Sequence, residues 1–218
     1  KICNLGMIDV NINTTESRYT GAFLGVDTRG YGSVSIENCF VSGIVSSNTG
    51  NVSGIIGFSD NGDGASLKNV YNLAKVCTVS GCSSGIANSI YTRDQLSYCM
   101  YNRGEIISET EDNENFPISC YVYNFYDHNS KMESGYYLQG NSADDDNATP
   151  LTETQMKNSK FYTGFDFENT WFIDPYSNYP YPQLRSCPQK RINSIEVTKQ
   201  PNKTVYQQGE NFDFTGAT

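Results

Sequence analysis

The chain of 218 residues has one histidine, His128, and few charged side chains, at 18%. A single imidazole excludes metal sites built from several histidines and argues against catalysis by a Ser-His or Cys-His pair. With 15 Lys and Arg against 24 Asp and Glu, the net charge is −9. This charge argues against nucleic acid as a partner, because nucleic-acid binders neutralise phosphates with cations. No apolar run approaches the roughly 20 residues of a membrane span, so we expect no membrane insertion in this segment.

The cysteines are too few for a small domain held together by disulfides. There are seven, an odd number that leaves at least one thiol unpaired. Cys77 and Cys82 are separated by four residues, but no second pair completes a zinc-type set. We expect several cysteines to be small buried hydrophobic residues, which suits a reducing or anaerobic habitat. The sequence does not show which of them pair, if any.

Internal repetition is the most informative feature that is present. Gly-apolar-apolar-Gly blocks occupy 21–25 and 53–57, and a third copy occupies 84–88. A second block follows each, at 39–45, 70–76 and 100–106. Gly25 to Gly57 spans 32 residues and Cys39 to Val70 spans 31, so two independent anchors agree on one period. Strand-length blocks that bury an apolar face only against the next repeat predict a β-solenoid, with coils about 4.8 Å apart.

Asparagine recurs at one position of this repeat. Asn4, Asn38 and Asn69 each directly precede an apolar residue or cysteine. The match places Lys1 late in a preceding turn of the solenoid. Asparagines at equivalent positions of stacked coils either form an internal ladder of side-chain amides or serve turns, and the sequence leaves both open.

The two blocks, taken in order, resemble the GLUG-motif repeats of bacterial surface and secreted proteins. They read G-A-F-L-G-V … I-E-N-C-F-V-S-G-I-V and then S-G-I-I-G-F … L-K-N-V-Y-N-L-A-K-V, within residues 1 to about 106. The third copy departs from the pattern, with Asn88 where the closing glycine belongs. The resemblance implies a right-handed parallel β-helix in a large, modular, surface-exposed protein.

Three segments are expected along the chain. Residues 1–140 form the all-β solenoid, and residues 141–186 supply a loop, a short helix and an aromatic-rich stretch. Thr149-Pro150 offers an N-cap and a proline at the first helical position, which predicts a helix over 151–158. The aromatic-rich stretch is similar to the unit that closes GLUG arrays, so we expect it to be the C-terminal cap that solenoids need.

Residues 187–218 are expected to be a linker followed by the first strands of an immunoglobulin-like β-sandwich. They resemble the opening of a bacterial Ig-like domain through the pieces I-x-V-T, K-T-x-Y-x-x-G-E and F-D-F-T-G. About 27 residues carry this resemblance, against roughly 100 in a complete sandwich. We therefore expect the chain to be a fragment of a longer protein.

One loop has the composition of a calcium site. Asp60, Asn61 and Asp63 alternate with glycine in an oxygen-rich stretch, but the remaining ligands of a calcium loop are missing. The stretch also lies where the solenoid needs a turn. We therefore interpret it as a turn, with calcium as the weak alternative, and expect no other cofactor. The run 144–146 is interpreted as a solvated charge cluster.

The aromatic residues of the expected cap allow two interpretations. Their rings either fill the cap or form a platform on which sugars stack, since aromatic faces with polar edges suit that task. Packing is the favoured interpretation. The tentative ligand-binding residues are Trp171, Tyr176, Tyr179 and Tyr181.

Carboxylates near Trp171 raise the question of an enzyme. Asp166, Glu168 and Asp174 could supply the paired carboxylates of glycoside hydrolysis. Three coils span only ~15 Å at the inter-strand spacing, which is short for a polysaccharide groove, and no constellation of side chains converges. We therefore expect no catalytic residues and no enzyme.

The sequence predicts a non-catalytic structural or presentation module, a stalk of the adhesin type, in an extracellular bacterial cell-surface or secreted protein. Its expected partners are surface glycans or proteins and neighbouring domains of the same chain. Two alternatives stay open. One is a glycan- or host-ligand-binding module that uses the aromatic residues, and the other is a polysaccharide-active β-helix enzyme.

Overall fold

The computed structural model describes residues 1–27, 34–59, 65–91, 97–109, 115–123, 135–143, 148–177, 179–188, 202–203, 211 and 215. The chain divides into two units, residues 1–188 and residues 189–218. In the second unit the backbone N–H of Asn202 donates to the Thr215 carbonyl, with 3.0 Å between N and O. The expected Ig-like strands otherwise lie outside the described residues and stay a prediction.

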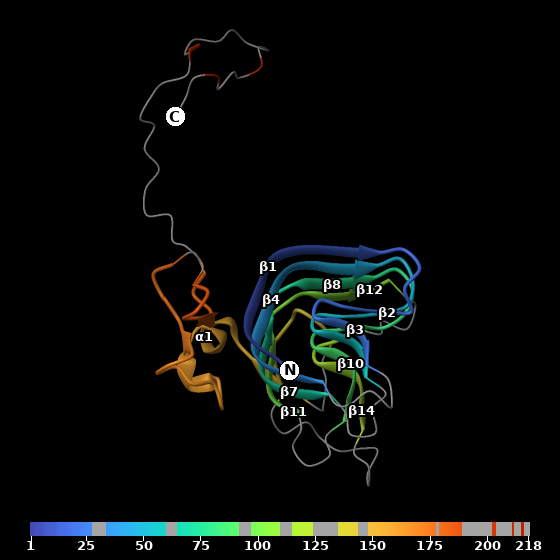
Figure 1. The fold of residues 1–218 in the computed structure, drawn as a ribbon, viewed down its shortest axis with the longest axis horizontal. Coiled ribbons are helices and arrows are strands. Elements are labelled where there is room, and N and C mark those ends of the chain that lie inside the picture. The colour runs from blue at the N-terminus through green and yellow to red at the C-terminus, as the bar shows by residue number, and fades with distance from the viewer. Residues whose placement is uncertain are drawn as a thin grey trace. The chain divides into compact units, whose positions relative to one another are not determined.

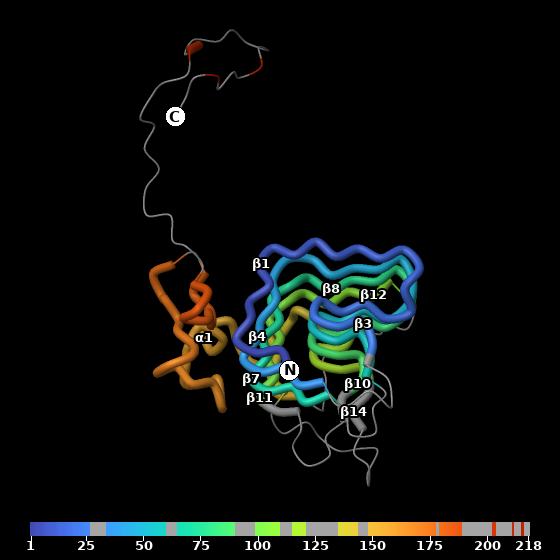
Figure 2. Tube along the Cα trace, in the orientation of Figure 1, coloured from blue at the N-terminus to red at the C-terminus, as the bar shows by residue number. Residues whose placement is uncertain are grey.

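The first unit is a parallel β-solenoid of about three turns (Figure 1). The largest sheet contains β1 Ile2–Thr14, β4 Ser35–Ser47, β7 Ser66–Asn72, β8 Lys75–Thr78, β11 Ser97–Asn102, β12 Ile106–Ser108, β15 Gly135–Leu138 and β16 Thr149–Leu151. A second contains β2 Tyr19–Gly21, β5 Asn51–Ser53, β9 Ser83–Ser84 and β13 Asn115–Phe116. A third contains β3 Leu24–Asp27, β6 Ile56–Ser59, β10 Ala87–Tyr91 and β14 Ser119–Tyr123. Figure 2 shows the successive coils lying one behind the other, in blue, cyan and green.

The strand register reproduces the predicted repeat. Leu67 lies opposite Ile36, and Val70 lies opposite both Cys39 and Met100 on its two neighbouring strands. These five side chains point into the solenoid and are essentially unexposed. Apolar side chains of one coil therefore stack on those of the next, and the prediction that no repeat buries its apolar face alone is confirmed.

The recurring asparagines form a ladder of side-chain amides, but the ladder is not internal, since Asn4 is exposed, and its members lie within β1, β4 and β7 and not in turns. Asn4, Asn38 and Asn69 adopt left-handed backbone conformations, with φ of 55°, 51° and 52°. Asparagine tolerates this region better than most residues. Asn69 Nδ2 donates to Asn38 Oδ1 over 3.0 Å, and Asn38 Nδ2 donates to Asn4 Oδ1 over 3.2 Å. The next coil places Cys99 at this position with φ 57°, and the amide ladder ends there.

A second pair of asparagines lies inside the solenoid. Asn72 Nδ2 donates to Asn102 Oδ1 over 2.8 Å, and both side chains are buried. Each also holds its own bend, because its Oδ1 accepts the backbone N–H two residues later, from Ala74 and Gly104, at 3.1 Å. The amides are thus satisfied within the interior, as buried polar groups must be.

The glycines of the repeated block are required by these asparagines and by the neighbouring coil. A Cβ atom at Gly54 would overlap the Gly85 carbonyl oxygen and lie 2.5 Å from Asn72 Cγ. A Cβ at Gly85 would overlap the Pro117 carbonyl oxygen and lie 2.5 Å from Asn102 Cγ. The motif glycine therefore marks a place where the chain meets another backbone closely.

The aromatic-rich segment covers the side of the solenoid, whereas we expected a cap over its end. Phe40, Tyr71, Tyr101 and Tyr136 are aligned on successive strands and form an aromatic stripe on the outer face of the largest sheet. The segment packs on this stripe and includes β17 Trp171–Phe172 and β18 Gln183–Leu184, which pair antiparallel. In Figure 1 it is the orange part beside β4, β7 and β11. An apolar stripe of this size requires cover, which accounts for the placement.

The short helix begins later than expected. Residues Thr149–Leu151 form β16, parallel to β15, and Pro150 is tolerated there because that strand lies at the edge of the sheet. The helix α1 Glu153–Met156 instead has Thr152 as its N-cap, in a capping box with Gln155. A 3-10 helix, Ser159–Phe161, follows. Within the described ranges no helix is long and apolar enough to cross a bilayer.

We predict that Gly85→Ala destabilises the solenoid by at least about 2 kcal/mol, because the new methyl group would overlap a carbonyl oxygen of the next coil. Gly25→Ala is the matched control. Its methyl group would meet only the Tyr19 carbonyl oxygen, at 3.4 Å, so its effect should stay within about 0.5 kcal/mol. Urea unfolding followed by far-ultraviolet circular dichroism measures both. Equal stability of the two variants would show that the motif glycine is not required sterically.

Candidate functional site

The cluster between the aromatic stripe and the segment that covers it contains two of the four tentative ligand-binding residues. We call this cluster the joint; it comprises Phe40, Tyr71, Cys99, Tyr101, Leu138, Leu151, Met156, Tyr162, Phe165, Trp171, Tyr181 and Leu184. Trp171 is 0% exposed, with its ring centroid 4.6 Å from that of Phe165 and 6.4 Å from that of Phe40. Tyr181 is 5% exposed. Both rings are occupied in packing the joint.

Tyr176 and Tyr179 lie differently. Tyr179 is half-buried, with its ring 5.4 Å from that of Tyr181 in an edge-on arrangement. Tyr176 is 82% exposed and belongs to neither core cluster. The structure therefore brings Tyr179 and Tyr181 together, and Tyr176 is the only one of the four tentative residues that is largely exposed.

Charged groups link the helix α1 to the coil that contains β11 and β12, at the edge of the joint. Arg103 lies with its guanidinium carbon 4.1 Å from the Tyr181 ring centroid, and its Nη2 is 3.2 Å from Glu153 Oε1. Lys157 Nζ is 3.1 Å from the same oxygen, and the Tyr181 hydroxyl donates to it as well. One carboxylate thus holds two cations and a phenol.

These contacts set the protonation of Glu153. Burial alone would raise the pKa of its carboxyl group, but hydrogen bonds from Tyr181, Arg103 and Lys157 more than offset this. The pKa of Glu153 is therefore held below its usual range. The carboxylate is charged at neutral pH and supports the contact between α1 and the coil.

The buried tyrosines of the joint remain protonated. Burial is the main cause that raises the pKa of Tyr71, Tyr101, Tyr162 and Tyr179. Tyr101 donates its hydroxyl hydrogen to the Phe161 carbonyl over 2.9 Å, and Tyr162 donates to the Met156 carbonyl over 2.6 Å. The phenols act as neutral hydrogen-bonding groups and not as acids or bases.

Two of the three carboxylates considered for catalysis, Asp166 and Asp174, close local turns. Asp166 Oδ1 accepts the backbone N–H groups of Glu168 and Asn169 at 3.0 and 2.9 Å. The bond from Asn169 is the largest cause that lowers the pKa of Asp166. Asp174 Oδ1 accepts the N–H of Tyr176 at 3.0 Å. These bonds account for both aspartates structurally, while the absence of an enzymatic activity stays a prediction.

The tentative metal site cannot be placed. Asp60, Asn61 and Asp63 lie outside the described residues, as do residues 144–146. Among the side chains that are described, no three of His, Cys, Asp and Glu gather closely enough to hold a metal ion. Calcium therefore stays an untested alternative at this loop.

An open hollow of about 370 Å³ lies at the end of the largest sheet, beside β12. It is lined by Glu105, Ile106, Ile107, Asn115 and residues 140–143. The backbone N–H of Ile106 donates to the Asn141 carbonyl over 2.8 Å, so residue 141 partly covers this end of the sheet. None of the predicted site residues lines the hollow.

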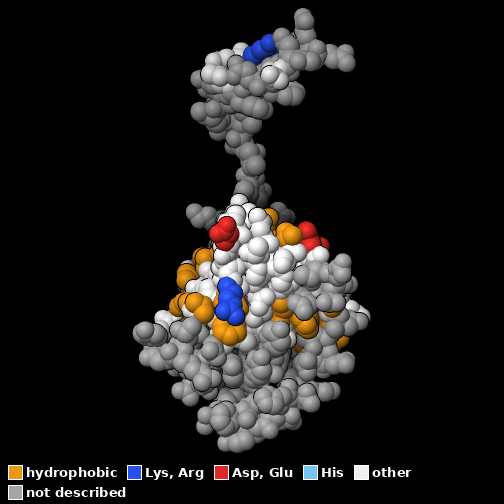
Figure 3. All heavy atoms as spheres, turned by 90° about the vertical axis from the view of Figure 1, so that its right-hand side faces the viewer, with side chains coloured by type: hydrophobic (Ala, Val, Ile, Leu, Met, Phe, Trp, Pro, Cys, Tyr) orange, Lys and Arg blue, Asp and Glu red, His pale blue; other side chains and the backbone are white. Residues whose placement is uncertain are grey.

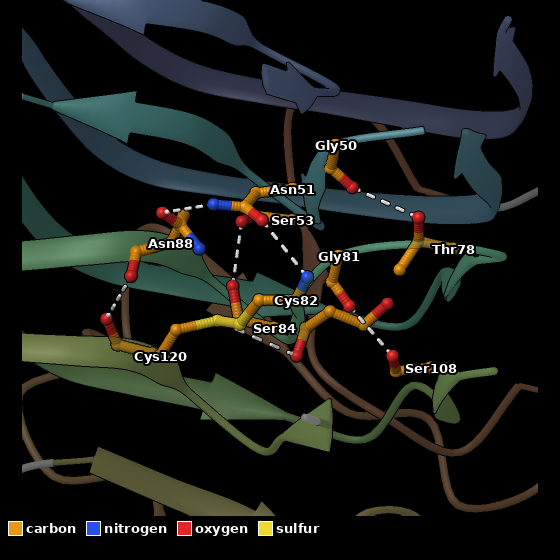
Figure 4. The surroundings of a disulfide bond; sticks show 12 residues. Gly50, Asn51, Ser53, Thr78, Gly81, Cys82, Ser84, Asn88, Ser108 and Cys120 are labelled. Atoms are coloured by element: carbon orange, nitrogen blue, oxygen red, sulfur yellow. Dashed lines mark hydrogen bonds between the residues drawn. A yellow bond between two sulfur atoms is a disulfide. The ribbon is translucent and has the colours of Figure 1, made fainter. Parts of the chain in front are cut away.

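A disulfide fastens two successive coils. Cys82, just before β9, is bonded to Cys120 in β14, 38 residues later (Figure 4). The N–H of Cys82 also donates to Asn51 Oδ1 over 3.0 Å. Cys39 and Cys99 are buried free thiols, as expected of several cysteines. A disulfide persists in oxidising compartments, contrary to the reducing habitat that the cysteine composition suggested.

Hydroxyl groups link the coils near the disulfide. Thr78 Oγ1 donates to the Gly50 carbonyl over 3.0 Å, and Ser108 Oγ donates to the Gly81 carbonyl over 2.8 Å (Figure 4). Inside the solenoid, Ser53 Oγ and Ser84 Oγ are 2.7 Å apart. On the face shown in Figure 3, few Lys, Arg, Asp and Glu side chains are visible among the described residues. These short hydroxyl groups add side-chain hydrogen bonds between coils.

Two features of the site were not identified from the sequence. The cysteine count alone could not pair Cys82 with Cys120. Arg103 could not be matched with Glu153, 50 residues away; only the spacing of Glu153 and Lys157, four residues apart on a helix, was a readable signal.

In comparisons with known proteins, the chain matches no family model, no curated protein and no solved structure.

Acidification should weaken the joint through Glu153. Because its pKa is lowered in the folded state, the carboxylate contributes stability above its unfolded pKa, near 4.5, and loses that contribution as pH falls through the folded value. The stability difference between wild type and Glu153→Gln should therefore shrink below about pH 4.5. Since the side chain is 42% exposed, the difference at neutral pH should be about 1 kcal/mol or less.

Trp171 is the only tryptophan, so its fluorescence during urea unfolding reports on the joint at each pH. Glu168→Gln, an exposed carboxylate outside the joint, serves as the control. A Glu153→Gln difference that does not change with pH would contradict this assignment.

Loss of the disulfide should cost about 2–4 kcal/mol of folding stability, as is typical for a bridge that closes a loop of this length. Cys82→Ser and a reducing agent should produce the same loss, and the reducing agent should have no further effect on the variant. Cys3→Ser, which removes an exposed free thiol, should behave as wild type. Wild-type protein that is insensitive to a reducing agent would show that the bridge does not form.

Proposed function

We propose that this chain is a non-catalytic structural and presentation module, of the adhesin-stalk type, in a bacterial cell-surface or secreted protein. The observation that carries the proposal is the continuity of side-chain ladders from coil to coil. Apolar residues, asparagine amides and aromatic rings each stack at fixed positions. A unit in which each coil holds the next in register suits a rigid spacer.

Two further observations support an extracellular setting. The bond between Cys82 and Cys120 joins successive coils and needs an oxidising environment to persist. The net charge of −9 keeps such a module soluble without a basic surface that would bind nucleic acid. The resemblance to GLUG repeats and to a bacterial Ig-like domain points the same way and is part of the proposal.

A glycan- or host-ligand-binding module is the second candidate, and Tyr176 favours it. Its ring is 82% exposed, and an exposed aromatic face is what sugar stacking requires. Trp171, Tyr179 and Tyr181 would contribute by holding the segment that carries it. The partners would be surface glycans or proteins.

We expect no saturable binding when the folded protein is applied to a broad glycan and mucin array, with and without calcium, and no release of products from polysaccharides. Tyr176→Ala is the informative variant, since its ring lies outside the joint and its loss should leave the fold intact. Val70→Asp, which puts a carboxylate into the apolar core, should not fold and serves as the control for non-specific adhesion. Dose-dependent binding that Tyr176→Ala abolishes would replace the spacer with the second candidate.

A further inference from the structure

The apolar column inside the solenoid is uncovered at the first coil. Leu5 in β1 lies opposite Cys39 in β4, which in turn lies opposite Val70 in β7. Cys39 and Val70 are 0% exposed, whereas Leu5 is 46% exposed. The other apolar residues of β1 that pack against the core are also only partly buried; they are Ile2, Met7, Val10 and Ile12. The surface that each later coil buries against the coil before it therefore stays open at β1.

The backbone edge of β1 is open as well. Within the described part of the chain β1 pairs with β4 alone, and in Figure 2 it is the dark-blue outermost strand of the stack. Free edge strands are usually protected from pairing by proline, by lysine or by a covering segment. From Ile2 to Thr14 the strand has no proline and no lysine, and its one charged residue is Asp9, beside the register irregularity between Met7 and Val10. On both sides of that irregularity the edge is free to pair with another strand.

The opposite end of the largest sheet differs. Its last strand, β16, contains Pro150, which has no N–H to give to a further strand. The N–H of Ile106 in β12 already donates to the Asn141 carbonyl over 2.8 Å. One end of the sheet is therefore protected from pairing, whereas the end formed by β1 has the composition of a strand that is paired.

The asparagine ladder gives the open face a direction. Asn69 donates to Asn38, and Asn38 donates to Asn4, in each case from Nδ2 to Oδ1. No described residue accepts from the Nδ2 of Asn4, whose side chain is exposed. The amide oxygen of an asparagine one coil further on could accept from it. A second copy joined through the same face would run antiparallel to β1 and would offer donors from its own ladder, so a coil of the same sense is the better match.

We propose that the open edge of β1 is a docking site for a further parallel coil of the same repeat. The incoming strand would carry asparagine in register with Asn4 and apolar side chains in register with Ile2, Leu5 and Ile12, as β4 does on the other side of β1. Its pairing would cover the apolar column and extend the amide ladder by one step. The inference continues the interface that already joins β1 to β4, and it does not depend on the proposed function.

A synthetic peptide with the sequence of β4 tests this, because β4 already has the required side chains. In the peptide, Cys39→Ser removes the native thiol. Glu37→Cys, activated as a thiopyridyl disulfide, places a reactive sulfur opposite the exposed thiol of Cys3 in the parallel register. Exchange with Cys3 should be roughly ten-fold faster than for a peptide that carries Ser46→Cys instead, because only the bound register raises the local concentration at Cys3. Mass spectrometry of proteolytic fragments identifies the linked cysteine.

Matched variants distinguish this contact from non-specific exchange. Asn38→Gly in the peptide keeps the left-handed backbone accessible but removes the amide, and it should slow the exchange several-fold. Leu5→Lys in the protein, at the open edge, should lower the rate to that of the Ser46→Cys peptide. Ile44→Lys, at a residue that is 44% exposed but lies in β4, should leave the rate unchanged. Cys3→Ser should abolish the exchange.

Equal rates for the two peptides, or a rate that Leu5→Lys does not change, would overturn the proposal. Faster exchange of the Ser46→Cys peptide with Cys3 would indicate an antiparallel strand and would overturn it as well. Sedimentation velocity of the protein alone should show a monomer. A dimer that Leu5→Lys dissociates would assign the face to a second copy in place of a further coil.

Discussion

The register between successive coils is the constraint on which the rest of this structure depends. A shift by one residue would turn every inward side chain outward. It would separate Val70 from Cys39 and Met100, and it would break the amide contacts of Asn38 with Asn69 and of Asn72 with Asn102. Because these apolar and polar ladders share one period of about 31 residues, each of them opposes the same slip. The disulfide fastens coils that are already aligned.

The repeat also determines the outer face of the largest sheet, where it produces an aromatic stripe. Stacking repeats that each carry an aromatic residue at one outward position produces the stripe of Phe40, Tyr71, Tyr101 and Tyr136. A stripe of this kind is unfavourable in water, and the segment from Met156 to Leu184 covers it with aromatic rings of its own. The covering segment therefore stabilises several coils at once, and the ion pairs of Arg103 and Lys157 with Glu153 fix where it begins.

Features that recur along the chain were predictable from the sequence, and single long-range contacts were not. The period identified the solenoid, its inward residues and the equivalence of Asn4, Asn38 and Asn69, because each coil repeats the information. The position of the aromatic segment beside the solenoid depends on a single contact surface, and the repeated blocks carry no signal for it. Thr149-Pro150 has the chemistry of a helix start, but its pairing with β15 took precedence over local propensity. The joint combines residues separated by 50 or more positions, such as Arg103 and Glu153, and a single sequence does not connect them.

The steric role of Gly54 and Gly85 changes how the repeat motif should be interpreted. Each glycine is required by a carbonyl oxygen of the adjacent coil and by an asparagine that fills the interior. The packing of the solenoid itself therefore explains these two motif glycines. Selection for folding alone would preserve them. A shared signature of this kind therefore indicates a shared way of stacking coils, whereas function depends on the sites that each solenoid carries.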